Sequence, residues 1–244
     1  MTVRSVKIYN GNIVENKYLY HSIKKLLQPD YQDFTSVLER ETKRCKNVYF
    51  LEVKGIVVGF FMTNWESISG KHAVYLGLNA VHEKFKNKGL TTLLYLRFIE
   101  DGILFEKQEK TKLILCATTA SPAVVNAVLK LSRNCSPNKN GEFNNYHKNL
   151  AISYAIKHDL KYSKNHPFIL KNAATKTLYS AKENERIEKL VNKHSFSLFE
   201  KLGIKEKKGD RLLMICELPK KESYLKIKNT CEYVMKKKLA KTLW

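Results

Sequence analysis

The sequence from Asn79 to Leu94 reads NAVHEKFKNKGLTTLL and joins two different hydrophobic patterns. It starts at the end of an apolar run, residues 73–81, which predicts a strand, and then passes through a lysine-rich turn that contains Gly89. Beyond the turn, apolar residues recur with near-helical spacing from Leu90 onward. A strand, a basic turn and a helix N-terminus in this order predict an anion-binding site, because free backbone N–H groups and the helix dipole both favour negative charge there.

The turn and its flanks resemble motif A of the GCN5-related N-acetyltransferases (GNAT). In that family a strand ending in Leu-Ala-Val is followed by Arg or Gln, two residues, Gly, one residue, and then Gly or Ala. This chain has Asn79-Ala80-Val81 and later Lys86-Asn87-Lys88-Gly89-Leu90-Thr91, so it departs from the pattern at Lys86 and Thr91. The resemblance implies an acetyl-CoA site in which the turn holds the pyrophosphate and the strand backbone pairs with the pantetheine arm.

The residues expected to bind acetyl-CoA follow from these roles. A glycine lets a phosphate approach the backbone closely, and lysines add full positive charge. Ser121 precedes a helical pattern that starts at Pro122; relatives often place Asn or Ser there, near the outer phosphates, although an ordinary helix N-cap also accounts for it. The whole set is Asn79, Ala80, Val81, Lys86, Asn87, Lys88, Gly89, Leu90, Thr91, Thr92 and Ser121.

Outward from this stretch, hydrophobic periodicity predicts the order of elements. The expected elements are a strand at 3–9, helices at 18–27 and 34–44, strands at 47–53, 56–65 and 73–81, a helix at 88–106, a strand at 113–118 and a helix from Pro122. This is the order that the resemblance to the GNAT family implies. We therefore expect an α/β (α+β) fold with a mixed central sheet of six to seven strands flanked by helices. The resemblance also implies that the fourth and fifth strands run parallel and splay apart around the pantetheine arm.

The rest of the chain is expected to complete a single domain at 1–218. Residues 133–180, with turn clusters and one helical candidate at 150–158, predict a helical insertion that either shapes the acceptor site or is decoration. Leu198 to Ile204 resembles a segment of the family in which many relatives keep, at the place of Phe199, a Tyr that protonates the departing thiolate. Residues 219–244 predict a basic amphipathic helix, which either docks on the body or binds a membrane surface or partner.

Composition limits the class of protein. The chain has 244 residues, of which 43% are hydrophobic, enough to bury a full core. Its formal net charge of +21 favours anionic partners, whether a phosphorylated cofactor, nucleic acid or an anionic membrane surface, without choosing among them. No apolar run reaches the roughly 18 residues of a membrane span, and the N-terminus lacks the apolar region of a secretory signal. The five cysteines have neither close pairs nor metal-like spacing, so we expect reduced thiols, no metal and a cytoplasmic location.

Acetyl transfer to an amine needs a bound donor, a base for the amine proton and a hydrogen-bond donor for the oxyanion. Histone-type relatives carry a Glu where this chain has Tyr75, which is a weak base because a phenol has a pKa of about 10. Glu66, near the end of the third strand, is the nearest carboxylate that could face the cleft. Glu66 and Tyr75 are thus the candidate catalytic residues, with His72, His82 or an ordered water as further candidates for the base.

The predicted function is that of an acetyl-CoA-dependent N-acetyltransferase, in which a primary amine attacks the thioester directly. A catalytically degenerate CoA-binding protein and a basic module for nucleic acid or a membrane are the alternatives. The sequence contains no Walker A, nucleophile-elbow or dinucleotide-binding motif. Among acceptors, a protein or peptide amine is favoured over a small polyamine, because a basic surface repels cationic small molecules.

Overall fold

The computed structural model describes residues 6–86, 88–174, 179–194 and 198–240. Within these residues, nine strands form one mixed sheet in the order β1-β2-β3-β4-β5-β9-β8-β7, with β6 also paired to β9. Of the strand pairs in the described part of the chain, only β4 with β5 is parallel. The strands are β1 (Lys7–Asn10), β2 (Asn47–Val53), β3 (Ile56–Ile68), β4 (Lys71–Val81), β5 (Ile114–Thr119), β6 (Arg133–Ser136), β7 (Lys161–Tyr162), β8 (Ile169–Lys171) and β9 (Arg211–Glu217).

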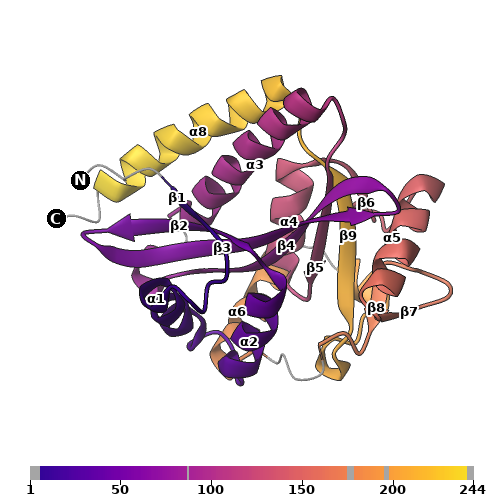
Figure 1. Ribbon diagram of the computed structural model, residues 1–244. Coiled ribbons are helices and arrows are strands. Elements are labelled where there is room, and N and C mark those ends of the chain that lie inside the picture. The colour runs from indigo at the N-terminus through magenta and orange to yellow at the C-terminus, as the bar shows by residue number, and fades with distance from the viewer. Residues whose placement is uncertain (1–5, 87, 175–178, 195–197, 241–244) are drawn as a thin grey trace.

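Helices cover both faces of the sheet (Figure 1). α1 and α2 lie on one face, and α3 and α8 lie together on the other. The helices are α1 (Lys17–Leu27), α2 (Phe34–Arg44), α3 (Leu90–Glu109), α4 (Pro122–Leu131), α5 (Asn145–Lys157), α6 (Ala181–His194), α7 (Leu198–Lys201) and α8 (Lys221–Ala240). The side chains of Asn16 and Asp33 cap α1 and α2 by accepting a backbone N–H from the first turn of each helix, which fixes where both helices begin.

Aromatic packing holds α3 against the sheet. Phe61 of β3 stacks on Tyr95 of α3 with their ring centroids 4.3 Å apart, and Phe98 of α3 meets Phe61 edge-on at 5.7 Å. All three side chains are buried. Because offset-stacked and edge-to-face arrangements are the favourable ones for aromatic pairs, this cluster fixes the start of α3 beside the end of β4.

The parallel strands β4 and β5 separate part-way along their length. They pair from Ala73 opposite Ile114 as far as Leu76 opposite Ala117, but β4 continues to Val81 with only β3 beside it. The register of β3 and β4 also shifts, so that one residue of β3 faces Gly77 and Leu78 of β4, as in a β-bulge. The splay implied by the resemblance is therefore present, and it begins at a bulge.

The expected fold class is confirmed, with nine strands in place of six to seven within the described residues. The difference comes from 133–180, predicted as a helical insertion. It contains α5 as expected but also β6, β7 and β8, and β8 joins the sheet by pairing with β9. These three strands have two to four residues each, too short to show an alternating pattern.

The basic helix at the end of the chain packs on the body. In α8, Tyr224 is buried and donates a hydrogen bond to Glu100 of α3, and Lys228 forms an ion pair with the same carboxylate at 2.5 Å. A boundary between 218 and 219 stays a prediction. Among the described helices, none is both long and apolar enough to cross a membrane.

Candidate active site

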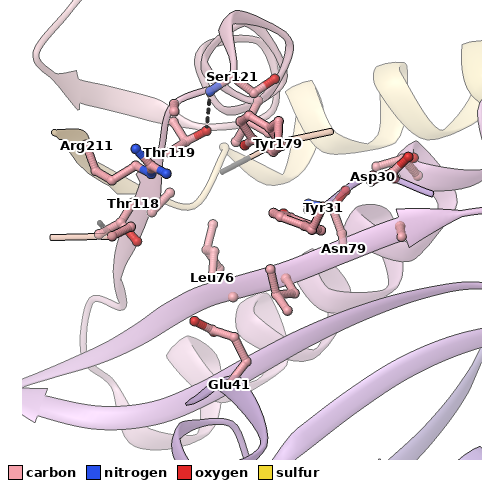
Figure 2. A pocket seen from close by; sticks show the side chains of 18 of the residues that line it. Asp30, Tyr31, Glu41, Leu76, Asn79, Thr118, Thr119, Ser121, Tyr179 and Arg211 are labelled. Carbon is pink, nitrogen blue, oxygen red and sulfur yellow. Dashed lines mark hydrogen bonds between the residues drawn. The ribbon is translucent and has the colours of Figure 1, made fainter. Parts of the chain in front are cut away.

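A cavity of about 460 Å³ lies where β4 and β5 separate. Its wall is formed by the second half of β4, the turn before α3, the end of β5, and side chains from α2, α6 and the start of β9 (Figure 2). Of the residues predicted from the sequence, those that line it are Tyr75, Asn79, Ala80, Val81, Lys86, Gly89, Leu90, Thr91 and Ser121. Lys88, Thr92 and Glu66 do not line it, and Asn87 lies outside the described residues.

Gly89 shapes one end of the cavity. Its φ of 85° is in the left-handed region that glycine adopts without strain, and it precedes the first residue of α3 with no side-chain cap. The N–H groups of the first helical turn have no partner inside a helix, and Leu90 and Thr91 of that turn line the cavity. This end of the cavity therefore offers backbone donors and the positive end of a helix dipole to an anion.

Lys86 lies at the same end, but acidic residues hold it. Its Nζ is 2.7 Å from Asp30 and 3.7 Å from Glu183, and both carboxylates also line the cavity. Burial raises the pKa of Asp30, while the hydrogen bond and charge of Lys86 act in the opposite direction. An anion bound at Gly89 must compete with these carboxylates for the lysine. Lys88 instead donates to the carbonyl oxygen of Lys84 at 2.5 Å.

Among the residues that the structure describes, no strand pairs with the cavity-facing edge of β4 from Gly77 to Val81. On its other edge, this stretch pairs with β3, for example Asn79 with Phe61. The backbone N–H and C=O groups on the open edge are therefore available to an extended ligand, since each strand residue directs its polar groups to one side or the other. The open edge leads directly to the start of α3.

Glu41 of α2 places a carboxylate beside the bulge. Its side chain is 2% exposed, accepts a hydrogen bond from the Tyr75 hydroxyl at 3.2 Å, and pairs with Nε of Arg40 at 3.0 Å. A Cβ added to Gly77 would lie 3.2 Å from Oε2 of Glu41 and 2.7 Å from Sγ of Cys45. The bulge glycine thus makes room for a buried carboxylate at the cavity wall.

Sequence reasoning did not select Glu41 as a site residue. It lies on the face of α2 that carries the buried Val37 and Leu38. A charged residue in an otherwise apolar helical stripe was the available signal, because carboxylates are rarely buried unless paired or functional.

Tyr75 is kept neutral and in place by its neighbours. Burial, and then the nearby Glu41 carboxylate, raise the pKa of Tyr75. The guanidinium carbon of Arg44 lies 3.3 Å from the centre of the Tyr75 ring, and Arg44 also donates to the Tyr154 hydroxyl at 2.6 Å. Tyr75 therefore acts as a hydrogen-bond donor to Glu41 and not as a proton acceptor.

The structure places Glu66 away from the cavity wall, in an ion-pair cluster with α5. Its carboxylate lies 2.7 Å from Lys157 and 3.0 Å from His158, with Arg44 at 4.0 Å. Burial raises the pKa of Glu66, but hydrogen bonds from His158 and Lys157 outweigh burial and hold the pKa below its ordinary value. Glu66 thus fastens α5 to β3 and lacks the access that a base needs.

The other side chains considered from the sequence also lie elsewhere. The ring of His72 packs edge-on against Phe105, and Nδ1 of His82 accepts the backbone N–H of Lys84 at the short 3₁₀ helix η1 (Glu83–Phe85). Phe199 packs against the hydrophobic core. None of these three side chains lines the cavity. Among the residues that the structure describes, no group of His, Cys, Asp or Glu side chains has the arrangement of a metal site.

Two tyrosines form a roof over the cavity. The rings of Tyr31, before α2, and Tyr179, before α6, lie 5.2 Å apart and both line the cavity (Figure 2). Next to them, the backbone N–H of Ser180 donates to the carbonyl oxygen of Asp30 at 3.0 Å, and the Ser180 hydroxyl donates to that of Pro29 at 2.8 Å. The loop between α1 and α2 is thereby joined to the segment before α6.

Neither a protein-family model nor a curated protein matches the sequence. Similar solved structures include the NatC complex bound to a Gag peptide and CoA, with 16% identity and a TM-score of 0.34 over 51% of this chain and 80% of that one. Another is the GNAT family N-acetyltransferase YhbS from Escherichia coli in complex with CoA, with 16% identity and a TM-score of 0.38 over 52% and 68%. A third is a ribosomal-protein-alanine N-acetyltransferase from Brucella melitensis biovar Abortus 2308, with 18% identity and a TM-score of 0.36 over 52% and 89%. Similarity of this size carries no argument about activity, which depends on the cavity itself.

Proposed function

We propose that this chain is an acetyl-CoA-dependent N-acetyltransferase that transfers the acetyl group to a primary amine by direct attack on the thioester. One observation carries the proposal: a single cavity joins an open strand edge, a bulge with a buried carboxylate, and an uncapped helix N-terminus. An extended ligand with a phosphorylated end matches this order. The turn at Gly89 takes the pyrophosphate, and the edge of β4 from Gly77 to Val81 takes the pantetheine arm.

In this proposal the main chain supplies most of the interaction with acetyl-CoA. Backbone donors at the start of α3 and along β4 suit a ligand whose phosphate and amide groups need hydrogen bonds at fixed spacing. The departures of Lys86 and Thr91 from the family's pattern therefore matter less than Gly89, whose φ of 85° no other residue adopts as readily. Lys86 adds charge once it leaves Asp30.

In this proposal the general base is Glu41, and it replaces Glu66, the candidate from the sequence. The amine nitrogen forms a bond to the thioester carbon, the oxyanion accepts a backbone N–H at the bulge, and the carbon–sulfur bond breaks. The amine nitrogen loses a proton to the Glu41 carboxylate, and Glu41 then transfers this proton to the departing CoA thiolate. The reaction therefore needs no other co-reactant. Tyr75 positions Glu41 through its hydrogen bond at 3.2 Å.

A CoA-binding protein without activity is the second candidate, since Lys86 is engaged by Asp30 and Glu183. A cytoplasmic location and contact with nucleic acid or a membrane stay predictions.

Thermal unfolding with acetyl-CoA tests cofactor binding, because a ligand at 100 times its Kd adds about 2.7 kcal/mol of stability. Gly89→Asp should remove this shift by steric block and by placing a carboxylate against phosphate. Gly70→Asp is the matched control: Gly70 also has a positive φ, of 72°, but lies in the β3–β4 turn with no atom near its Cβ position. Unchanged acetyl-CoA affinity in folded Gly89→Asp protein would refute the proposal. Release of free CoA with a panel of amines separates an enzyme from an inactive CoA-binding protein.

A further inference from the structure

The roof of the cavity joins two segments that are far apart in the sequence. Residues 29–31, in the loop between α1 and α2, meet residues 179–180, which lie just before α6. Tyr31 and Tyr179 are partners in an isolated antiparallel β-bridge, and their ring centroids are 5.2 Å apart (Figure 2). Both residues are half-buried and both line the cavity. The roof therefore separates the cavity from solvent.

Backbone hydrogen bonds hold the two sides of the roof together. The N–H of Ser180 donates to the carbonyl oxygen of Asp30 at 3.0 Å, and the Ser180 hydroxyl donates to that of Pro29 at 2.8 Å. An isolated bridge with a few hydrogen bonds can open locally without unfolding of the whole protein. The stability of the roof therefore depends strongly on any further contact between its two sides.

Lys86 supplies such a contact. Its Nζ lies 2.7 Å from Asp30, which belongs to the loop side of the roof, and 3.7 Å from Glu183, in the first turn of α6. Since one ammonium group reaches both carboxylates, the two acids lie close to each other, one on each side of the roof. The lysine comes from the turn before α3, at the end of the cavity where Gly89 and the helix N-terminus favour an anion.

The two carboxylates differ in what they keep if Lys86 is drawn away. Glu183 keeps Arg186, whose Nε donates to it at 2.7 Å. Among the residues that the structure describes, Asp30 forms an ion pair with Lys86 alone. Without the lysine, Asp30 would be a half-buried carboxylate with no cation and with a second carboxylate nearby. Because such a charge is unfavourable until it reaches water, the loop that carries Asp30 would then move away from α6.

We propose that binding of acetyl-CoA loosens the roof through Lys86: the phosphates at Gly89 attract the ammonium group away from Asp30 and Glu183, and the two sides of the roof then separate more easily. The inference rests on the proposed function and assigns a conformational response to that same cavity. A ligand shifts such an equilibrium only if it interacts differently with the two states, and here the difference is the partner of Lys86. The wall beside α2, the helix that carries Glu41, is therefore firmest before the acyl donor binds.

Hydrogen exchange at the Ser180 amide reports on the roof directly, because this N–H is protected by its bond to Asp30. Exchange is followed by mass spectrometry with and without saturating acetyl-CoA. A bound ligand ordinarily slows exchange, so faster exchange at this one amide is diagnostic. We expect the rate to rise roughly two- to fivefold, the size of a partly exposed ion pair. The amide of Gly11 donates to Lys46 at 2.8 Å away from the cavity, and its exchange should not become faster.

Variants of the lysine test whether it carries the response. Lys86→Gln should raise the exchange rate of Ser180 in the free protein, and acetyl-CoA should then add little. Lys86→Arg should keep the wild-type response, because a guanidinium group can also bridge two carboxylates. Lys182→Gln is the matched control: Lys182 lies next to Glu183 on α6 but pairs with Glu83 and does not line the cavity.

Asp30→Asn tests the other partner. An amide at this position needs no cation, so loss of Lys86 to the phosphates should no longer destabilise the loop. The backbone bond from Ser180 to residue 30 is kept. We expect acetyl-CoA to bind this variant without faster exchange at Ser180. Adding Lys86→Gln to Asp30→Asn should likewise change the exchange rate less than Lys86→Gln does alone.

The outcomes separate this inference from the proposed function. If acetyl-CoA stabilises the protein against thermal unfolding but leaves exchange at Ser180 unchanged or slower, the coupling is wrong and the proposed function stands. If acetyl-CoA accelerates exchange as much in Lys86→Gln as in wild type, the coupling does not run through Lys86 and the inference is overturned. If acetyl-CoA does not stabilise the protein at all, the proposed function and the coupling both fail.

Discussion

The hydroxyl of Tyr75 lies 3.2 Å from Oε2 of Glu41, and the two residues reach this contact from the sheet and from the helix that covers it. A carboxylate from α2 therefore lies beside the strand position at which the sequence resemblance implied a Glu and the chain has Tyr75. Because burial raises the pKa of Tyr75, the phenol donates its proton to the hydrogen bond and holds the carboxylate toward the bulge.

Glu41→Gln should lower kcat by roughly 100-fold or more and leave the Kd of acetyl-CoA unchanged, since an amide keeps the shape and accepts from Tyr75 but takes no proton. Single-turnover kinetics and titration calorimetry measure the two quantities. Glu66→Gln is the control: it removes a carboxylate of the same type that does not line the cavity, so kcat should change little. Equal turnover in Glu41→Gln and wild type would exclude Glu41 as the base.

Gly77→Ala should damage the site through the backbone. The new methyl group would lie 2.7 Å from Sγ of Cys45 and 3.2 Å from Oε2 of Glu41, so either the bulge or the carboxylate must move. We expect a loss of about 1–3 kcal/mol in the free energy of unfolding and a fall in kcat. For Gly59→Ala on β3, the atoms nearest to the new methyl group belong to Val81, Ala80 and Leu94 and lie no closer than 3.3 Å, so this substitution should cost less. Denaturant unfolding measures the free energy of unfolding of both variants. A Gly77→Ala protein with wild-type stability and kcat would contradict the close approach of Gly77 to Cys45 and Glu41.

The stretch from Asn79 to Leu94 was sufficient to predict the fold because its signals are local. A strand period, a turn with one glycine and a helix period all lie within one segment, and the strand, the turn and the helix were found as expected. The base could not be predicted in the same way. Glu66 resembles a cleft residue in the sequence, but Lys157 and His158, which neutralise it, arrive from a helix some ninety positions later. Glu41 lies thirty-four positions before Tyr75, so only the packing of α2 on β4 brings the two residues together.

The Glu66 cluster should make stability depend on pH in the acid range. The folded-state pKa of Glu66 lies below its ordinary value of 4.5, so the carboxylate contributes stability that is present above that pH and is lost as the pH falls through the folded-state pKa. The difference in free energy of unfolding between wild type and Glu66→Gln should therefore be largest near neutral pH and shrink in acid. Denaturant unfolding across the pH range measures this difference.

Glu185→Gln is the control. Glu185 forms an exposed pair with Lys189, so this variant should show a much smaller pH dependence because solvent screens that pair. A difference for Glu66→Gln that grows on acidification would contradict the assigned sign.

Asp30→Asn should strengthen acetyl-CoA binding, whereas Lys86→Ala should weaken it. Lys86 is held at 2.7 Å from Asp30, so a phosphate at Gly89 gains the lysine only by displacing the carboxylate. An amide competes less for the ammonium group and adds no negative charge beside the phosphate. A gain in affinity of about two- to fivefold matches the strength of a partly exposed ion pair. Titration calorimetry at low and high salt measures the Kd of acetyl-CoA for both variants, and the gain in affinity should shrink with salt.

Lys88→Ala is the control, because Lys88 does not line the cavity. Weaker binding in Asp30→Asn would mean that Asp30 supports the anion site through Lys86 and does not compete with the ligand for it.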